Sequence, residues 1–105
     1  MLMLKNIVKI KDEVHFIVHV EEDDGIYEYP ASVDFINGHL ISSEIPENKK
    51  MYELSSKMTK IVIINKNNRR KEFTKIQGKA MIKEKICFNM MYLLRTHPEN
   101  IFLLN

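Results

Sequence analysis

The fold is decided by residues 23–54, DDGIYEYPASVDFINGHLISSEIPENKKMYEL. Two glycine turns divide this stretch. Asp24–Gly25 and Asn37–Gly38 are dipeptides that favour type I′ hairpin turns, in which both central residues have positive φ. Pro30 lies between the turns and marks a strand start or a sheet edge. Pro46 follows them and fits the first turn of a helix. The stretch therefore predicts an antiparallel meander that leads into a helix.

Two further strands are predicted before this stretch. Residues 2–11 alternate loosely between apolar residues and lysines. Residues 14–20 alternate strictly, with β-branched or aromatic residues at every second position, which is the strongest strand signal in the chain. The strand at 26–36 and a returning strand at 39–43 then follow from the two glycine turns.

The second half of the chain predicts two helices among further strands. The first helix, at about residues 46–60, places Met51, Leu54 and Met58 at spacings of three and four, which turns one apolar face to a core. The other elements are a buried strand, a strand with a central glycine, a late helix ended by Pro98 and a short last strand, at residues 61–64, 72–82, 84–97 and 101–104.

These elements predict one mainly β (α+β) domain over residues 1–105, an antiparallel, barrel-like sheet with helices at its openings. One helix is inserted after the fourth strand and one comes late. The late helix is apolar nearly all the way round from Ile86 to Leu94, and in so small a domain a second chain is the simplest cover for it. We therefore expect a homodimer.

Composition excludes several classes of protein. A net charge of +2 is too small to indicate a nucleic-acid-binding surface. Cys87 is the single cysteine, so no internal disulfide forms, and a reducing cytoplasm is the expected location. The opening apolar run ends at Lys5, which is too early for a signal peptide or a membrane span. We expect a cytoplasmic protein that binds neither nucleic acid nor membrane.

The order of the elements resembles the split β-barrel flavoproteins of the pyridoxamine 5′-phosphate oxidase-like superfamily. Residues 38–54 match the family pattern without a gap, with a glycine turn, a strand, a proline and a lysine at Lys50. Gly78–Lys79–Ala80 matches the G-x-A strand of the family, and His97–Pro98 matches the end of its late helix. The resemblance covers roughly residues 14–104, and the order of the motifs carries it.

The resemblance implies a split β-barrel homodimer with FMN between the subunits, in which the flavin supplies the chemistry of an oxidoreductase acting on a small molecule. It implies a phosphate site of basic and hydroxyl side chains and a flavin ring along strand backbone. It assigns no catalytic residue. The residues that it implies for FMN binding are Tyr29, Pro30, Ala31, Ser32, Ser42, Ser43, Lys49 and Lys50.

Departures from the family pattern leave a second function open. Glu44 stands where the family commonly has a threonine on the phosphate, and a carboxylate there repels a phosphate. Tyr29 stands where the family often has a basic residue. The alternative is a flavin-free split barrel that binds another small ligand or a protein partner.

Other candidate sites have plain structural explanations. Lys49 and Lys50 open a helix and suit an anion, but a solvated surface pair explains them as well. His15 and His19 share one strand face without a third ligand, so we predict no metal site and expect a solvated face. The basic run at residues 69–71 lacks interleaved aromatic residues, which favours a charged hairpin tip over a nucleic-acid site.

Overall fold

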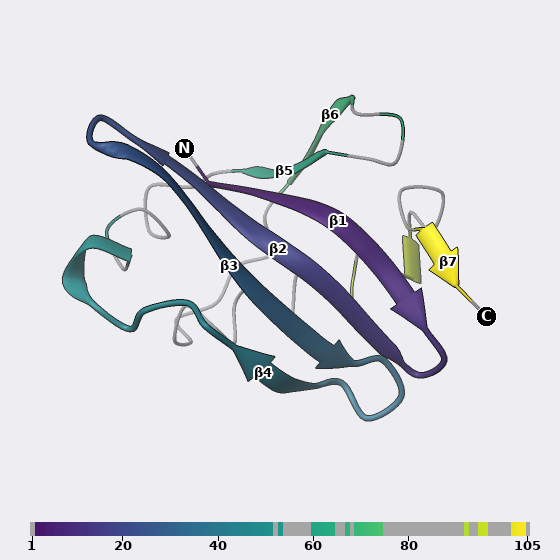
Figure 1. Cartoon of the computed structure of the whole chain (residues 1–105). Coiled ribbons are helices and arrows are strands. Elements are labelled where there is room, and N and C mark those ends of the chain that lie inside the picture. The colour runs from purple at the N-terminus through teal and green to yellow at the C-terminus, as the bar shows by residue number, and fades with distance from the viewer. Residues whose placement is uncertain are drawn as a thin grey trace.

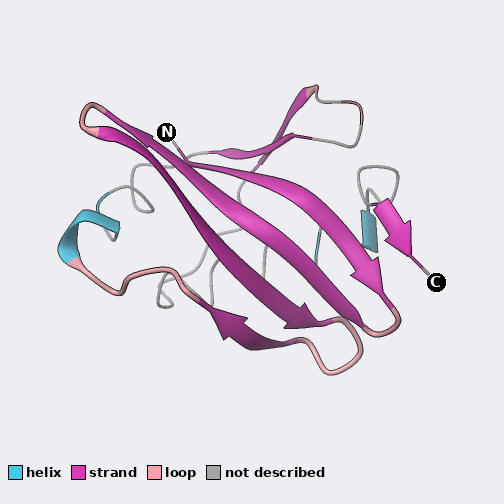
Figure 2. Cartoon of the chain, in the orientation of Figure 1, coloured by secondary structure: helices cyan, strands magenta, loops and turns pink. Residues whose placement is uncertain are grey.

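The computed structural model in Figure 1 is built mainly of β-strands, as the sequence predicts. The structure describes residues 2–51, 53, 60–64, 67, 69–74, 92, 95–96 and 102–104. The strands are β1 (Leu2–Ile10), β2 (Glu13–Glu22), β3 (Gly25–Asp34), β4 (His39–Ser43), β5 (Lys60–Ile64), β6 (Arg70–Thr74) and β7 (Phe102–Leu104). Among the described residues, helix occurs at 49–51, 53, 92 and 95–96 (Figure 2).

The strands form one sheet in the order β4-β3-β2-β1-β5-β6, with β7 also paired to β1. β1 to β4 are antiparallel neighbours in chain order, which confirms the predicted meander. The sheet is mixed, however, because β5 and β7 both run parallel to β1. No pairing of β4 with β6 occurs between the described strands, so closure into a split barrel stays a prediction.

A β-bulge explains how β1 serves two partners along one edge. The register of β1 against β2 shifts between Lys5 and Val8, so Asn6 and Ile7 together face Phe16 of β2. Asn6 has a φ of 53°, a conformation that asparagine adopts more readily than most residues. A bulge bends its strand. The part of β1 before the bend pairs with β5, and the part after it pairs with β7.

The core lies on one face of the meander, here called the inner face. The alternation at residues 14–20 predicts this face correctly, since every second residue from Val14 to Val20 is buried. Met51 also reaches the core, as the predicted first helix requires. The buried cluster consists of Leu4, Ile7, Val14, Phe16, Val18, Val20, Ala31, Val33, Ile45, Met51 and Ile63.

The hairpin between β2 and β3 is not the predicted type I′ turn. Glu22 pairs with Gly25, so the two central residues are Asp23 and Asp24. Neither of them has positive φ, whereas type I′ requires it at both positions. A glycine directly after the central pair is the preference of a type I turn. The Asp-Gly signal therefore located the turn correctly and misplaced its register by one residue.

The hairpin between β3 and β4 also differs from the predicted type I′ turn. Its loop has four residues, 35–38, and Gly38 has a φ of 71° while Asn37 has no positive φ. The Asp34 carboxylate Oδ1 accepts hydrogen bonds from the amides of Ile36 and Asn37, both at 2.9 Å. The Asp34 carbonyl accepts a third from the Gly38 amide at 2.9 Å. Asp34 thus fixes a longer loop than the dipeptide alone predicts.

Part of the predicted C-terminal half cannot be compared with the structure. The G-x-A motif, Cys87, His97–Pro98 and most of the late helix lie outside the described residues. The homodimer prediction depends on that helix and stays a prediction. Within the part of the chain that the structure describes, no helix has the length and apolar character needed to cross a membrane.

Candidate functional site

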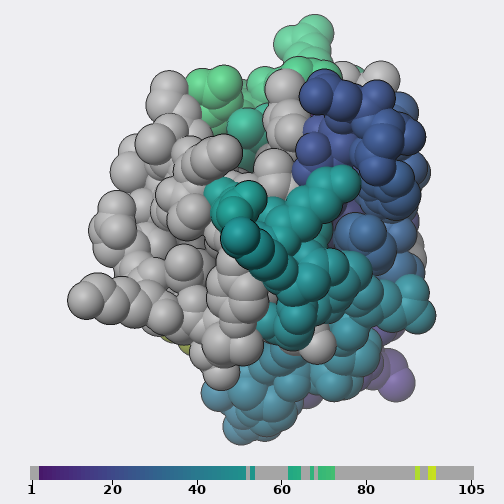
Figure 3. Space-filling model, turned by 90° about the vertical axis from the view of Figure 1, so that its left-hand side faces the viewer, coloured from purple at the N-terminus to yellow at the C-terminus, as the bar shows by residue number. Residues whose placement is uncertain are grey.

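A pocket of about 240 Å³ lies where the tip of the β2–β3 hairpin meets the helical turn that follows β4. Figure 3 shows this side of the molecule, with the teal segment near residue 50 against the blue hairpin. Two of the predicted cofactor-binding residues, Tyr29 and Lys50, line it. The described residues that line it are Val20, Glu22, Tyr27, Tyr29, Asn48, Lys50 and Met51.

Strand alternation brings two tyrosines to one wall of this pocket. Tyr27 and Tyr29 are two residues apart on β3, so their side chains emerge on the same face. Val20 lies opposite Tyr27 on β2 and is buried. Glu22, two residues after Val20, falls on that face as well. The wall therefore combines aromatic rings, an aliphatic residue and a carboxylate.

The opposite wall of the pocket is formed by Asn48, Lys50 and Met51, and a helix cap at Asn48 positions it. The Asn48 side-chain oxygen accepts a hydrogen bond from the Met51 amide at 3.0 Å, which is the contact of an N-cap residue three positions before its partner. The helical turn consequently begins at Lys49, three residues later than predicted, and Pro46 lies in the loop before it and not in the first helical turn. Met51 packs into the core from this turn, and Lys50 projects over the hairpin tip.

Lys50 is already engaged at the rim of the pocket. Its Nζ lies 3.6 Å from Asp24 Oδ1 and 5.6 Å from the centroid of the Tyr27 ring. The Tyr27 hydroxyl donates to Asp24 Oδ2 at 3.0 Å. This hydrogen bond, with the nearby Lys50 charge, lowers the pKa of Asp24, and Asp24 in turn raises the pKa of Tyr27. The ammonium of Lys50 therefore has a carboxylate partner before any ligand arrives.

Glu22 has no such partner within the residues that the structure describes. Its Oε1 is buried and makes no hydrogen bond among the described residues. A buried carboxylate oxygen without a donor is unfavourable, because it has lost water and gained nothing in exchange. Glu22 is not among the site residues that the sequence predicts. Its position two residues after Val20 was the signal that could have assigned it to the inner face.

The predicted FMN-binding residues of β3 and β4 divide between two faces of the sheet. Tyr29 and Ala31 lie on the inner face, whereas Pro30 and Ser32 lie on the opposite, outer face. Ser32 pairs with Ser42 there, and their hydroxyl oxygens are 2.9 Å apart. Pro30 lies just beyond the pairing of β4 with β3, which agrees with the predicted sheet edge.

The remaining predicted residues have local structural contacts or none that reach the pocket. Ser43 lies on the inner face, and its hydroxyl accepts a hydrogen bond from the Ile45 amide at 3.1 Å. Glu44 is exposed, and its amide donates to the Pro30 carbonyl at 3.0 Å. Lys49 is exposed and does not line the pocket. The structure thus gathers only Tyr29 and Lys50 of the predicted set.

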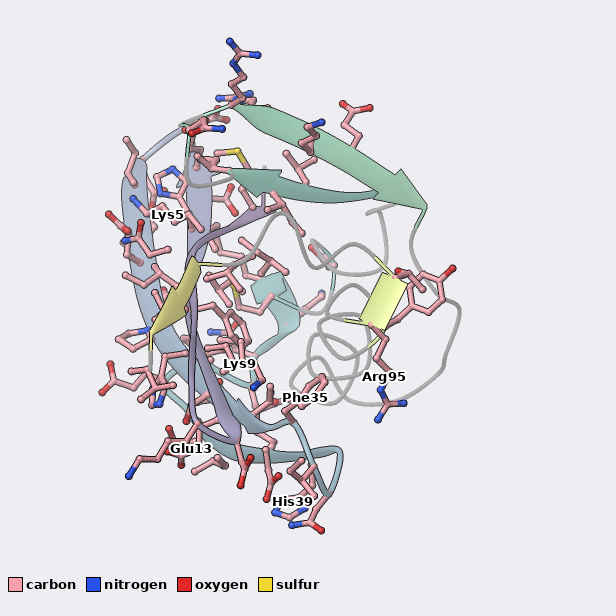
Figure 4. The ribbon with its side chains drawn as sticks, turned by 90° about the vertical axis from the view of Figure 1, so that its right-hand side faces the viewer. Lys5, Lys9, Glu13, Phe35, His39 and Arg95 are labelled. Atoms are coloured by element: carbon pink, nitrogen blue, oxygen red, sulfur yellow. The ribbon has the colours of Figure 1, made fainter. Side chains whose placement is uncertain are left out.

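The outer face holds a polar cluster that the sequence did not predict. His19 is only 8% exposed, which contradicts the expected solvated face, although His15 on the same face is exposed. His19 Nε2 lies 3.1 Å from Glu21 Oε1. Lys5, labelled in Figure 4, places its Nζ 2.7 Å from Glu28 and thereby lowers the pKa of that carboxyl. The described residues hold no group of His, Cys, Asp or Glu side chains suited to a metal ion.

A second arrangement of cations and an aromatic ring lies at the far end of the sheet. Figure 4 shows Phe35 between Lys9 and Arg95. Lys9 Nζ is 5.2 Å from the centre of the ring, and the guanidinium carbon of Arg95 is 6.0 Å from it. Both distances permit cation–π attraction. This contact joins a residue from late in the chain to β1 and the loop after β3.

Comparisons with known proteins identify no relative, since no family model, no curated protein and no solved structure matches this chain. The resemblance to the split-barrel flavoproteins therefore stays a prediction, and the geometry of the pocket has to carry the functional argument.

Proposed function

We propose that this chain is a flavin-free binding module whose small-molecule ligand occupies the pocket at the β2–β3 hairpin tip. The observation that carries the proposal is Glu22, which lines that pocket and whose Oε1 is buried and makes no hydrogen bond among the described residues. Tyr27 and Tyr29 add ring surface on which an organic ligand can pack. Glu22, Asn48 and Lys50 add polar groups that can fix the orientation of such a ligand.

Size and charge both favour this proposal over FMN. The pocket, at about 240 Å³, is smaller than the roughly 300 Å³ at which typical ligand sites begin, so it suits a ligand of about one ring. A flavin phosphate directed at Lys50 would also approach Glu22 and Asp24, and both carboxylates would repel it. FMN binding remains the rival proposal, with the split-barrel homodimer that accompanies it.

Fragment binding followed by ¹H–¹⁵N NMR tests the proposal. Neutral, cationic and anionic single-ring fragments are added in turn to the intact chain. We expect at least one class to shift the amides of Val20, Glu22 and Tyr27 while leaving loop 35–38 unchanged. If no class shifts the pocket amides, the proposed function is wrong.

A matched pair of valine variants localises the binding. Val20→Leu enlarges a buried side chain that lines the pocket, whereas Val18→Leu enlarges a buried side chain on the same face that does not. Both substitutions should lower stability by a similar amount, roughly 1–3 kcal/mol. Only Val20→Leu should weaken fragment binding.

Titration of FMN by fluorescence quenching tests the rival. Saturable quenching that Lys50→Ala weakens and Lys49→Ala leaves unchanged would favour the flavin protein over the flavin-free module. Sedimentation velocity at low micromolar concentration tests the accompanying homodimer, because an obligate interface stays formed at that concentration.

A further inference from the structure

We propose that the ligand of this pocket carries a protonated amine. Its N–H group donates a hydrogen bond to the free Oε1 of Glu22, and the Glu22 carboxylate is its counter-charge. This inference rests on the proposed function, because it assigns a ligand class to the same pocket. It follows from the carboxylate of Glu22, from the position of Lys50 and from the two tyrosine rings.

Two neighbouring carboxylates show what is missing at Glu22. Glu21 lies on the outer face and has its partner, since Oε1 is 3.1 Å from His19 Nε2. Glu22 lies on the inner face, where its Oε1 is cut off from water and has no donor among the described residues. A ligand that brings an N–H⁺ group would satisfy this oxygen, and charge-assisted hydrogen bonds are the stronger kind. A ligand carboxylate or phosphate would leave it unsatisfied and repelled.

Lys50 does not fill this role, although it lines the same pocket. Its described contacts are with Asp24 and Tyr27 at the rim, and no ion pair with Glu22 occurs in the described part of the chain. Among the described residues, the side chains at the site therefore carry two carboxylates, Glu22 and Asp24, against the ammonium of Lys50. The negative charge without a described counter-charge lies at Glu22, where one carboxylate oxygen is buried and a cation is attracted more strongly than in bulk water.

The tyrosine rings favour the same class of ligand. The Tyr27 ring already accepts an ammonium, since Lys50 Nζ lies 5.6 Å from its centroid. Tyr29 is half-buried two residues further along the same face and presents a second ring to the pocket. Aromatic side chains around a carboxylate attract organic cations through cation–π contact and charge together. A neutral ligand would gain only the apolar part of this interaction.

Three probes of one size separate these possibilities, namely benzylamine, benzyl alcohol and benzoate at neutral pH. They share a ring and differ in the charge of the head group. Dissociation constants come from the shifts of the pocket amides during NMR titration. We expect benzylamine to bind roughly tenfold to a hundredfold more tightly than benzyl alcohol, and benzoate to bind most weakly.

The decisive variants are Glu22→Gln and its control Glu21→Gln. Glu22→Gln keeps the shape of the side chain and removes its charge, so it should abolish the preference for benzylamine. Glu21→Gln removes a charge one residue away on the other face and should leave the preference intact. Thermal unfolding without a probe adds a second readout. Glu22→Gln should melt no lower than wild type, because it removes the charge of a carboxylate whose buried Oε1 has no donor among the described residues.

Each contrary result identifies what is wrong. If none of the probes shifts the pocket amides, the proposed function fails and the amine inference fails with it. If benzyl alcohol binds as tightly as benzylamine, the pocket stands as a binding site and the amine inference alone fails. If the preference for benzylamine survives in Glu22→Gln, or if that variant melts well below wild type, Glu22 is not the free acceptor and the inference is overturned.

Discussion

The two ends of the β2–β3 hairpin both combine a cation, an aromatic ring and a carboxylate, but they differ in how the carboxylate is paired. The loop end is the end next to loop 35–38, and the tip is the turn at Asp23 and Asp24. At the loop end, Phe35 lies between Lys9 and Arg95. Asp34 accepts hydrogen bonds from the amides of Ile36, Asn37 and Gly38 there. At the tip, Lys50 lies over Tyr27, but the nearby Glu22 has a buried oxygen with no hydrogen-bond partner in the described part of the chain. An end whose polar groups are paired contributes to stability. An end that keeps one unpaired beside a pocket is the better candidate for binding.

The largest expected difference between the two ends concerns their aromatic rings. Phe35→Ala should lower the free energy of unfolding by roughly 2–4 kcal/mol, because Phe35 packs against the core. Tyr27→Ala should have a smaller effect, since Tyr27 is 38% exposed. Urea unfolding measures both. Phe35→Leu is the control that keeps the apolar bulk, and it should lose only about 0.5–1 kcal/mol per cation–π pair. Equal losses for the two alanine variants would contradict the comparison.

The glycines of the two hairpins should also differ in what they tolerate. Gly25 at the tip has a φ of 147°, whereas Gly38 in the loop has a φ of 71°, which lies near the left-handed helical region. Gly25→Ala should cost roughly 1–3 kcal/mol, and Gly38→Ala only about 1 kcal/mol. An added Cβ meets no close neighbour at either site, so backbone strain alone is tested. Gly38→Asn should be the mildest change, and chemical denaturation ranks the three variants.

The fold was predictable where the information is local. The period of two across residues 14–20 fixed β2 and its buried face, because one face of that strand must meet the core. The double partnership of β1 was not predictable, since it depends on the bend at Asn6 and on strands far along the chain. The loop at 35–38 was misjudged because the Asp34 side chain stabilises a longer turn than Asn37–Gly38 alone indicates.

The candidate site was predictable only in part, for a similar reason. Tyr29 and Lys50 came from the resemblance, and their meeting depends on the Asn48 cap that brings the helical turn to the hairpin tip. The serines were assigned to the same site, but alternation sends Ser32 and Ser42 to the outer face. Glu22 is a candidate because its buried Oε1 makes no hydrogen bond among the described residues, and a sequence pattern cannot predict a missing hydrogen bond.

A smaller effect is expected in the β1–β2 turn, which adjoins the loop end through a hydrogen bond from the Phe35 amide to the Asp12 carbonyl at 2.8 Å. Lys11 has a φ of 55°, which is strained for a residue with a side chain. Lys11→Gly should therefore stabilise the protein by roughly 0.5 kcal/mol, after the greater freedom of glycine in the unfolded chain is subtracted. Asp12→Gly is the matched control, because Asp12 has no positive φ and glycine should destabilise there. A rise in the melting temperature for both variants would show that strain at Lys11 is not the cause.

The smallest expected effect is a pH dependence shared by the two ends. Hydrogen bonds from the Asn37 amide and side chain lower the pKa of Asp34, and the hydrogen bond from Tyr27 lowers the pKa of Asp24. A carboxyl whose pKa is lower in the folded state binds fewer protons there than in the unfolded chain. Its stabilising contribution is therefore present above the unfolded pKa, near pH 4, and is lost as the pH falls through the lower folded value.

Asp34→Asn and Asp24→Asn should each flatten the loss of stability below about pH 4, measured as melting temperature against pH. The flattening should be small, because both carboxylates are solvent-accessible and screened. The effect of added salt on stability should differ between Asp24 and Asp34. Asp24 depends partly on the charge of Lys50, so added salt should reduce its contribution, whereas Asp34 is held mainly by neutral donors and should respond less. An equal response of both variants to salt would show that Lys50 does not act on Asp24, and would leave the Lys50 ammonium free for a ligand.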